Sequence, residues 1–155
     1  MAFQKLRSEE AEFTAYLERI KQKSSVAIEF FENSGSSSLA NDTWLLTAKH
    51  YYTVSDEYLT VNGLDHAYNN GLADEFEVIR ELKRLVAQRE QLMLLAENVR
   101  INATLLTYLR NMSNFRQYLI DLCRYFEREV SQGRKPKLDV TALEYVQSRA
   151  AQFLR

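Results

Sequence analysis

Hydrophobic positions recur at helical spacing through most of the chain and are separated by short polar segments. Between residues 8 and 32, apolar side chains return every three or four positions and end at Ile28 and Phe31, which is the pattern of an amphipathic helix. Ser8 has the residue type preferred at a helix N-cap. The segment at about 33–41, rich in serine, then predicts a flexible linker.

The segment 42–61 admits two interpretations. Its β-branched and aromatic residues favour two strands of a hairpin. Trp44, Tyr51 and Tyr58, however, stand seven positions apart, and this spacing places them on one side of a helix. Because periodicity is the stronger signal, we predict a helix that ends near Gly63.

The second half of the chain predicts a loop and three further helices. Residues 63–71 form the loop, which closes with an Asn-Asn-Gly turn. A long helical pattern follows over 72–110, and the next helix begins at Ser113 and ends at Gly133. A basic linker at about 133–138 precedes a last helix, which starts at Asp139 or Thr141.

The long pattern at 72–110 suggests a central helix. Around residues 92–96 apolar side chains cover most of the circumference, so this part is expected in the core or in an oligomer interface. Asn98, Asn102 and Thr104 are weak helix formers that could bend or break it. We therefore predict an all-α fold, a compact bundle of four to five helices with one long central helix, which a kink could interrupt.

Composition agrees with one helical domain over residues 1–155. The chain is 46% hydrophobic and 26% charged, unlike a disordered chain. Only 4 glycines and 1 proline are present, too few for the turns of a typical all-β fold. The single cysteine, Cys123, excludes an internal disulfide, and its apolar neighbours predict that it packs as a small hydrophobe.

No catalytic or cofactor-binding motif emerges from the spacing of chemically active residues. The chain has 2 histidines, His50 and His66, and neither follows a glutamate three positions earlier, as the usual di-metal bundle requires. We therefore expect no metal and no cofactor. Acidic pairs such as Asp56 and Glu57 are interpreted as solvated helix faces, and His50 is placed on the polar side of its helix.

Two groups of residues are candidates for binding. The first is aromatic and would contact protein, while stacking on nucleic-acid bases and simple core packing remain the alternatives: Trp44, Tyr51, Tyr52 and Tyr58. The second group is basic and could bind an acidic partner or phosphates, while an ordinary solvated surface remains the alternative: Arg124, Arg128, Arg134, Lys135 and Lys137.

Charge is divided unevenly along the chain. Residues 1–97 carry a net charge of -6 and residues 98–155 carry +5, so the whole chain has -1. This division fits an acidic or phosphate-bearing partner, attraction between copies, or two parts that neutralise each other within one fold.

These observations lead to a ranked set of expected functions. The first is a non-enzymatic helical adaptor or assembly subunit that acts through contacts with itself or with another protein. The alternative is a nucleic-acid-associated accessory subunit that uses its basic C-terminal helices, and a ligand pocket within the bundle ranks third. No apolar stretch is long enough to span a membrane, so the expected location is the cytoplasm, or the host cytoplasm for a phage or viral protein.

Overall fold

The structure is a computed structural model that describes residues 2–33, 39–98 and 113–138. Within these ranges the chain forms helices and no strands: α1 (Ala2–Asn33), α2 (Leu39–Asn69), α3 (Glu75–Asn98) and α5 (Ser113–Ser131). The all-α prediction is confirmed, and the hairpin alternative for 42–61 is wrong. Three predictions lie outside the described residues: the last helix, the middle of the serine-rich linker at 34–38, and the expected bend near Asn102.

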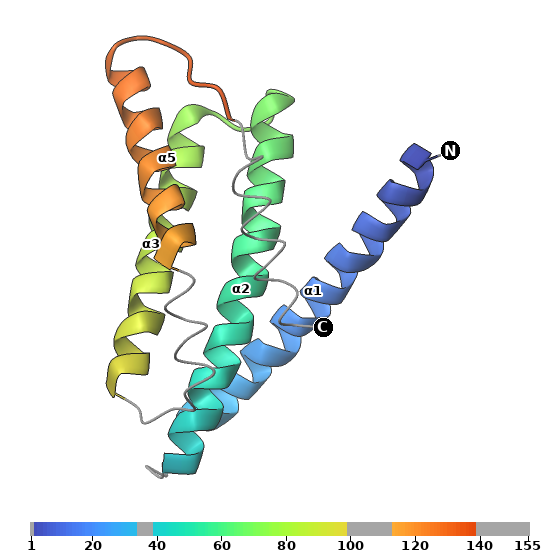
Figure 1. The fold of residues 1–155 in the computed structure, drawn as a ribbon, viewed down its shortest axis with the longest axis vertical. Coiled ribbons are helices and arrows are strands. Elements are labelled where there is room, and N and C mark those ends of the chain that lie inside the picture. Colours follow the sequence, from blue (N-terminus) through green and yellow to red (C-terminus); the bar gives the residue numbers. More distant parts are fainter. Residues whose placement is uncertain (1, 34–38, 99–112, 139–155) are drawn as a thin grey trace.

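The described helices, taken in order, run in alternating directions, and each packs on the next one described (Figure 1). The main contacts join α1 to α2, α2 to α3, and α3 to α5. Toward its N-terminus α1 diverges from the other helices, so α2 lies between α1 and α3. This position explains why every residue from Thr53 to Glu57 is buried, because a helix covered on two sides has little solvent-facing surface left.

The main core draws on all the described helices. Its apolar side chains follow the three-to-four spacing of each helix, and Leu17, Val78, Leu85, Leu119 and Phe126 are among those fully buried. A second, smaller apolar cluster joins Leu46 of α2 to Leu92 and Ala96 of α3. It lies nearer the end of the bundle where α2 begins and the described part of α3 stops (Figure 1).

Helix boundaries are where the sequence predictions are least accurate. Helix α1 begins at Ala2, so Ser8 lies inside it and is not its N-cap. Helix α2 continues through Gly63 to Asn69, because Leu64 and Tyr68 belong to the main core and their burial outweighs the roughly 1 kcal/mol that a helical glycine costs.

Two glycines end helices in the same way. At the end of α2, Gly71 N donates to Tyr68 O and Leu72 N donates to Ala67 O. Helix α5 ends with the equivalent pair of bonds around Gly133, so both ends are Schellman motifs. The glycines have φ of 73° and 72°, the left-handed conformation that this motif requires. The predicted turn at 69–71 and the predicted stop at Gly133 are thus confirmed.

Helix α3 begins three residues later than its apolar pattern suggests. The Asp74 side chain accepts a hydrogen bond of 2.8 Å from Glu77 N, which is the geometry of an N-cap. The predicted start at Leu72 is wrong because Leu72, together with Gly71, completes the Schellman motif of α2.

Candidate functional site

Charged side chains in the middle of α2 form the most unusual local chemistry of the described structure. Asp56 and Glu57 are 1% and 2% exposed, and His50 is 4% exposed. The expectation that the acidic pair lies on a solvated face is therefore wrong, as is the placement of His50 on the polar side. Buried charges are costly unless opposite charges and hydrogen bonds compensate them, so their partners decide what this cluster does.

Glu57 forms a fully buried ion pair with Arg89 of α3. The two carboxylate oxygens accept hydrogen bonds from Arg89 Nε, at 2.8 Å, and from Arg89 Nη2. Arg89 is 0% exposed. Burial raises the pKa of the Glu57 carboxyl, and the charge of Arg89 opposes this effect. The paired contact is the bidentate geometry that suits a guanidinium and a carboxylate.

Asp56 connects α2 to both neighbouring helices. Its carboxylate accepts a hydrogen bond of 2.9 Å from Lys21 Nζ of α1 and one of 2.7 Å from Arg84 Nη1 of α3. Thr60 Oγ1 donates to the same carboxylate, at 3.2 Å. Burial alone would raise the pKa of Asp56, but the bonds from Arg84 and Lys21 lower it. Asp56 is thus held ionised at the junction of three helices.

His50 lies seven positions before Glu57, on the same side of α2, and is also buried. Burial, with a smaller effect from the charge of Arg89, lowers the pKa of His50 to about 3. Its ring meets the ring of Tyr51 edge-on, with 5.9 Å between centroids. The imidazole is therefore neutral at physiological pH and has no charge to exchange there.

This cluster is built for structure rather than for reaction. Acid–base catalysis needs groups poised to exchange protons with a substrate in a cleft, whereas Glu57 and Asp56 are enclosed and held by cations. A sequence signal for Arg89 does exist. Leu82, Leu85, Arg89, Leu92 and Ala96 follow the three-and-four spacing of one buried stripe, so Arg89 occupies a core position in which an arginine requires a buried partner.

The four aromatic candidates of α2 do not share one environment. Tyr58 meets Phe13 of α1 edge-on, with ring centroids 5.1 Å apart, and Tyr51 packs against the main core. Tyr52 lies 5.5 Å from Lys21 Nζ. These three tyrosines are half-buried, whereas Trp44 is 61% exposed. The structure thus directs the tyrosines into contacts within the bundle and leaves Trp44 at the surface.

The basic candidates also divide into separate groups. Arg124 and Arg128 are exposed on α5, and so is Lys137 after the helix. Arg134 Nε contacts Glu129 Oε2 at 2.6 Å, and Lys135 Nζ lies 5.8 Å from the ring of Tyr68. The basic linker is therefore partly committed to contacts within the chain, and the cations of α5 remain open to solvent.

Cys123 packs in the main core as predicted, with 6% exposure. Burial and a hydrogen bond to Glu127 raise the pKa of its thiol to about 11. The thiol is therefore protonated at neutral pH and is a poor nucleophile.

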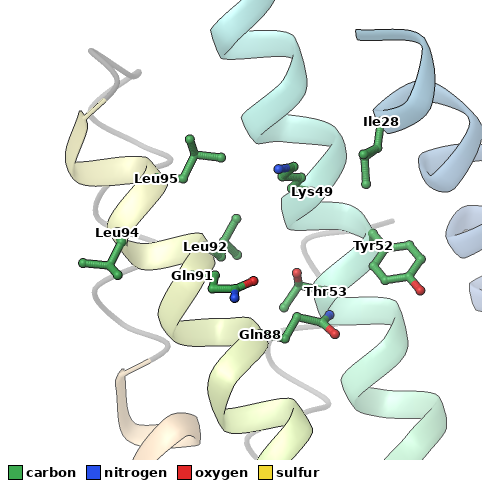
Figure 2. A pocket seen from close by; sticks show the side chains of 9 residues that line it. All are labelled: Ile28, Lys49, Tyr52, Thr53, Gln88, Gln91, Leu92, Leu94 and Leu95. Carbon is green, nitrogen blue, oxygen red and sulfur yellow. The ribbon is translucent and has the colours of Figure 1, made fainter. Parts of the chain in front are cut away.

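An open groove of about 560 Å³ lies where α1, α2 and α3 meet. Figure 2 shows α2 in the middle, with Ile28 of α1 on one side and Leu92 and Leu95 of α3 on the other. Leu94 points away from α2. Apolar and amide side chains make up most of its lining: Ile28, Lys49, Tyr52, Thr53, Gln88, Gln91, Leu92, Leu94 and Leu95.

Neither metal ligation nor similarity to known proteins points to a function. The described residues contain no group of three metal-ligating side chains close enough to hold an ion. Among the described helices, none is apolar over a length that would cross a bilayer. Comparison with protein-family models, curated proteins and solved structures gives no match.

Proposed function

We propose that this chain is a non-enzymatic assembly subunit that acts through protein–protein contacts, with a second copy of itself as the partner. The observation that supports this function is a pair of exposed apolar side chains on α1. Val26 and Phe30 are 58% and 68% exposed, although each is a residue type that folded proteins usually bury.

Both side chains lie on the face of α1 that turns away from α2. Leu17 and Ser24 are buried on the other side of the helix, where α1 packs against α2. Among the exposed residues of α1, one set recurs at three-to-four spacing and centres on Val26: Arg19, Gln22, Lys23, Val26, Glu29, Phe30 and Asn33. This spacing is the contact pattern that a helix presents to another helix. We call this set the α1 outer stripe.

Charge placement in the α1 outer stripe favours a second copy of the same helix. Lys23 and Glu29 lie three positions before and after Val26, and neither forms an ion pair with another described residue. In an antiparallel pair of α1 helices related by a two-fold axis at Val26, Lys23 of each copy faces Glu29 of the other. Such reciprocal contacts are the mark of an isologous dimer, and the net charge of -1 adds little repulsion between copies.

A charge-swap series tests this arrangement. Lys23→Glu places two glutamates opposite each other, and Glu29→Lys places two lysines opposite each other, so each single variant should weaken self-association measured by sedimentation velocity. The double variant Lys23→Glu with Glu29→Lys restores opposite charges across the two-fold axis and should recover association. Phe30→Ser should also weaken it, because the substitution removes apolar area from the contact.

Leu72→Ser is the matched control, because Leu72 is 73% exposed in the turn after α2 and lies away from the α1 outer stripe. It should leave association unchanged. A sedimentation coefficient that corresponds to the 18.1 kDa monomer at every protein concentration would contradict a second copy as the partner. A double variant as weak as the single variants contradicts the antiparallel register.

A further inference from the structure

The second exposed surface of interest lies along α3 and α5. Phe76, Arg80 and Lys83 share one face of α3 at four- and three-residue spacing, and the three side chains are 67%, 72% and 62% exposed. Arg124 and Arg128 are exposed one turn apart on α5. We call these five residues the basic–aromatic surface.

Contacts between α3 and α5 bring the two halves of this surface together. Lys83 Nζ of α3 lies 3.3 Å from Glu127 Oε1 of α5. Cys123 and Lys83 hold the pKa of Glu127 below its usual value by hydrogen bonding, and the charge of Arg124 contributes to the same shift. Lys83 thus contacts Glu127 from α3, and Arg124 lies three positions before Glu127 on α5, so both cations border the same turn of α5.

The surface has more positive charge than its own acids neutralise. Glu127 meets Lys83, and Glu77 lies 3.8 Å from Arg80. Asp121, exposed three positions before Arg124, accepts a hydrogen bond from Gln117, so four cations stand beside three carboxylates. Arg124 and Arg128 form no ion pair with any residue that the structure describes. Guanidinium groups bind phosphate oxygens through two parallel hydrogen bonds, so two arginines one turn apart and open to solvent suit successive phosphates.

The exposed ring of Phe76 indicates which class of polyanion this surface would bind. A phenylalanine beside cations offers a stacking surface for an unpaired base, and this combination is typical of single-strand recognition. The Asp and Glu side chains of an acidic peptide offer no flat ring to stack on Phe76, and the bases of a duplex are already stacked. We infer that the basic–aromatic surface binds single-stranded nucleic acid, with the cations on the phosphates and Phe76 under a base.

Binding of a fluorescent 20-nucleotide oligo(dT) and of an oligo(U) of equal length, measured by anisotropy, tests the inference. The logarithm of the association constant should fall with the logarithm of salt concentration with a slope of about -3, since each phosphate contact contributes about -0.7. Arg124→Ala with Arg128→Ala should reduce affinity at least tenfold and make this slope shallower by about 1.4. A preference between the two oligonucleotides would show which nucleic acid is bound.

Phe76→Ala should reduce affinity about 5- to 150-fold while leaving the salt slope unchanged, because it removes stacking and no charge. Each variant has a matched control on α1. Arg19→Ala with Lys23→Ala makes the same change of charge at two exposed positions four residues apart, and Phe30→Ala removes an exposed ring from another surface. Because both controls alter the α1 outer stripe, affinities are compared at protein concentrations where every variant is monomeric. Under that condition both controls should bind oligo(dT) as the unaltered chain does.

Several results would overturn the inference. One is the absence of binding at 50 mM salt, and another is an equal loss of affinity in the controls. If polyglutamate displaces oligo(dT) at equal charge concentration, the partner is an acidic protein segment. If a 20-base-pair duplex binds as tightly and Phe76→Ala has no effect, the surface reads phosphates alone. Failure of the self-association experiment leaves this inference intact, because the α1 outer stripe and the basic–aromatic surface share no residue.

Discussion

Arg89 is the largest fully buried side chain among the described residues. It lies on a stripe whose other members are leucines and an alanine, so the helix places a cation where packing alone would favour an apolar residue. Glu57 faces it from α2 with a bidentate contact. A buried pair of this kind contributes little net stability over an apolar pair, but losing either partner leaves a charge in the interior.

Arg89→Met should therefore destabilise the protein by about 3–5 kcal/mol, because it leaves the Glu57 carboxylate buried without its cation. Glu57→Leu should have a similar cost. The double variant should lose far less than the two single losses combined, since it removes both charges from the core. Urea unfolding measures all four proteins, and additive losses would show that the two side chains do not depend on each other.

His50 links stability to pH through the lowered pKa of its buried imidazole. The folded pKa is about 3 against an ordinary 6.5, so the unfolded chain takes up a proton in a range where the folded chain does not. The contribution to stability is complete above pH 6.5 and declines as pH falls toward 3. Between pH 7 and pH 5 the loss should be about 2 kcal/mol.

Urea unfolding of the unaltered chain and of His50→Gln at several pH values measures this effect. The variant has no group that titrates at this position, so its stability should change less between pH 7 and pH 5. Asp56 adds acid sensitivity only at lower pH, because its pKa is already below 3.8 and its contribution is lost as pH falls through that lower value. Equal pH profiles for both proteins would contradict a neutral buried His50.

The helices differ in how far their sequences determine them. Seven-residue spacing identifies α2 despite its β-branched and aromatic residues, because the repeat places Tyr51 and Tyr58 on one side of the helix, where both pack against the main core. The ends of α2 and α5 follow from glycines that adopt positive φ. The sequence also predicts that a helix ends near Gly63, but α2 continues past it because Leu64 and Tyr68 pack in the main core. Local sequence thus predicts the existence of a helix better than the residue at which it ends.

The contrast between Gly63 and Gly71 gives a test of these helix ends. Gly63 is helical, and a Cβ added there would meet no atom beyond the local helix backbone within 4 Å, so Gly63→Ala should stabilise the protein by about 0.5–1 kcal/mol. Gly71 has φ of 73°, and Gly71→Ala should destabilise it by about 1 kcal/mol. Thermal unfolding of the two variants should shift the midpoint in opposite directions, and shifts of the same sign would contradict the assigned helix end.

The charged cluster at the centre of the bundle is only partly accessible to sequence reasoning. The position of Arg89 in an apolar stripe is visible in the sequence, but its partner on α2 depends on how α2 and α3 pack. In the sequence, Asp56 and Glu57 look like a solvated acidic pair. In the structure they have different partners, because adjacent helix residues point in different directions. Each reaches cations on a neighbouring helix, and no local pattern encodes that contact.

At the level of the whole molecule, the described helices leave two different surfaces exposed. The α1 outer stripe combines two exposed apolar side chains with charges of both signs, a composition that suits a protein contact. The basic–aromatic surface on α3 and α5 has an excess of cations beside one ring. A subunit that joins copies of itself through one surface and holds a polyanion with the other would use both, and the two surfaces can be altered separately.

The most direct test of the proposed assembly is a disulfide at its two-fold axis. Val26→Cys places one thiol from each copy at the centre of the antiparallel contact, where facing positions of two packed helices approach closely enough to bond. The buried Cys123 should not interfere. Under mild oxidation Val26→Cys should form a covalent dimer, whereas the similarly exposed Leu72→Cys control should remain monomeric. Equal cross-linking of the two variants, or none in either, would contradict the proposed contact.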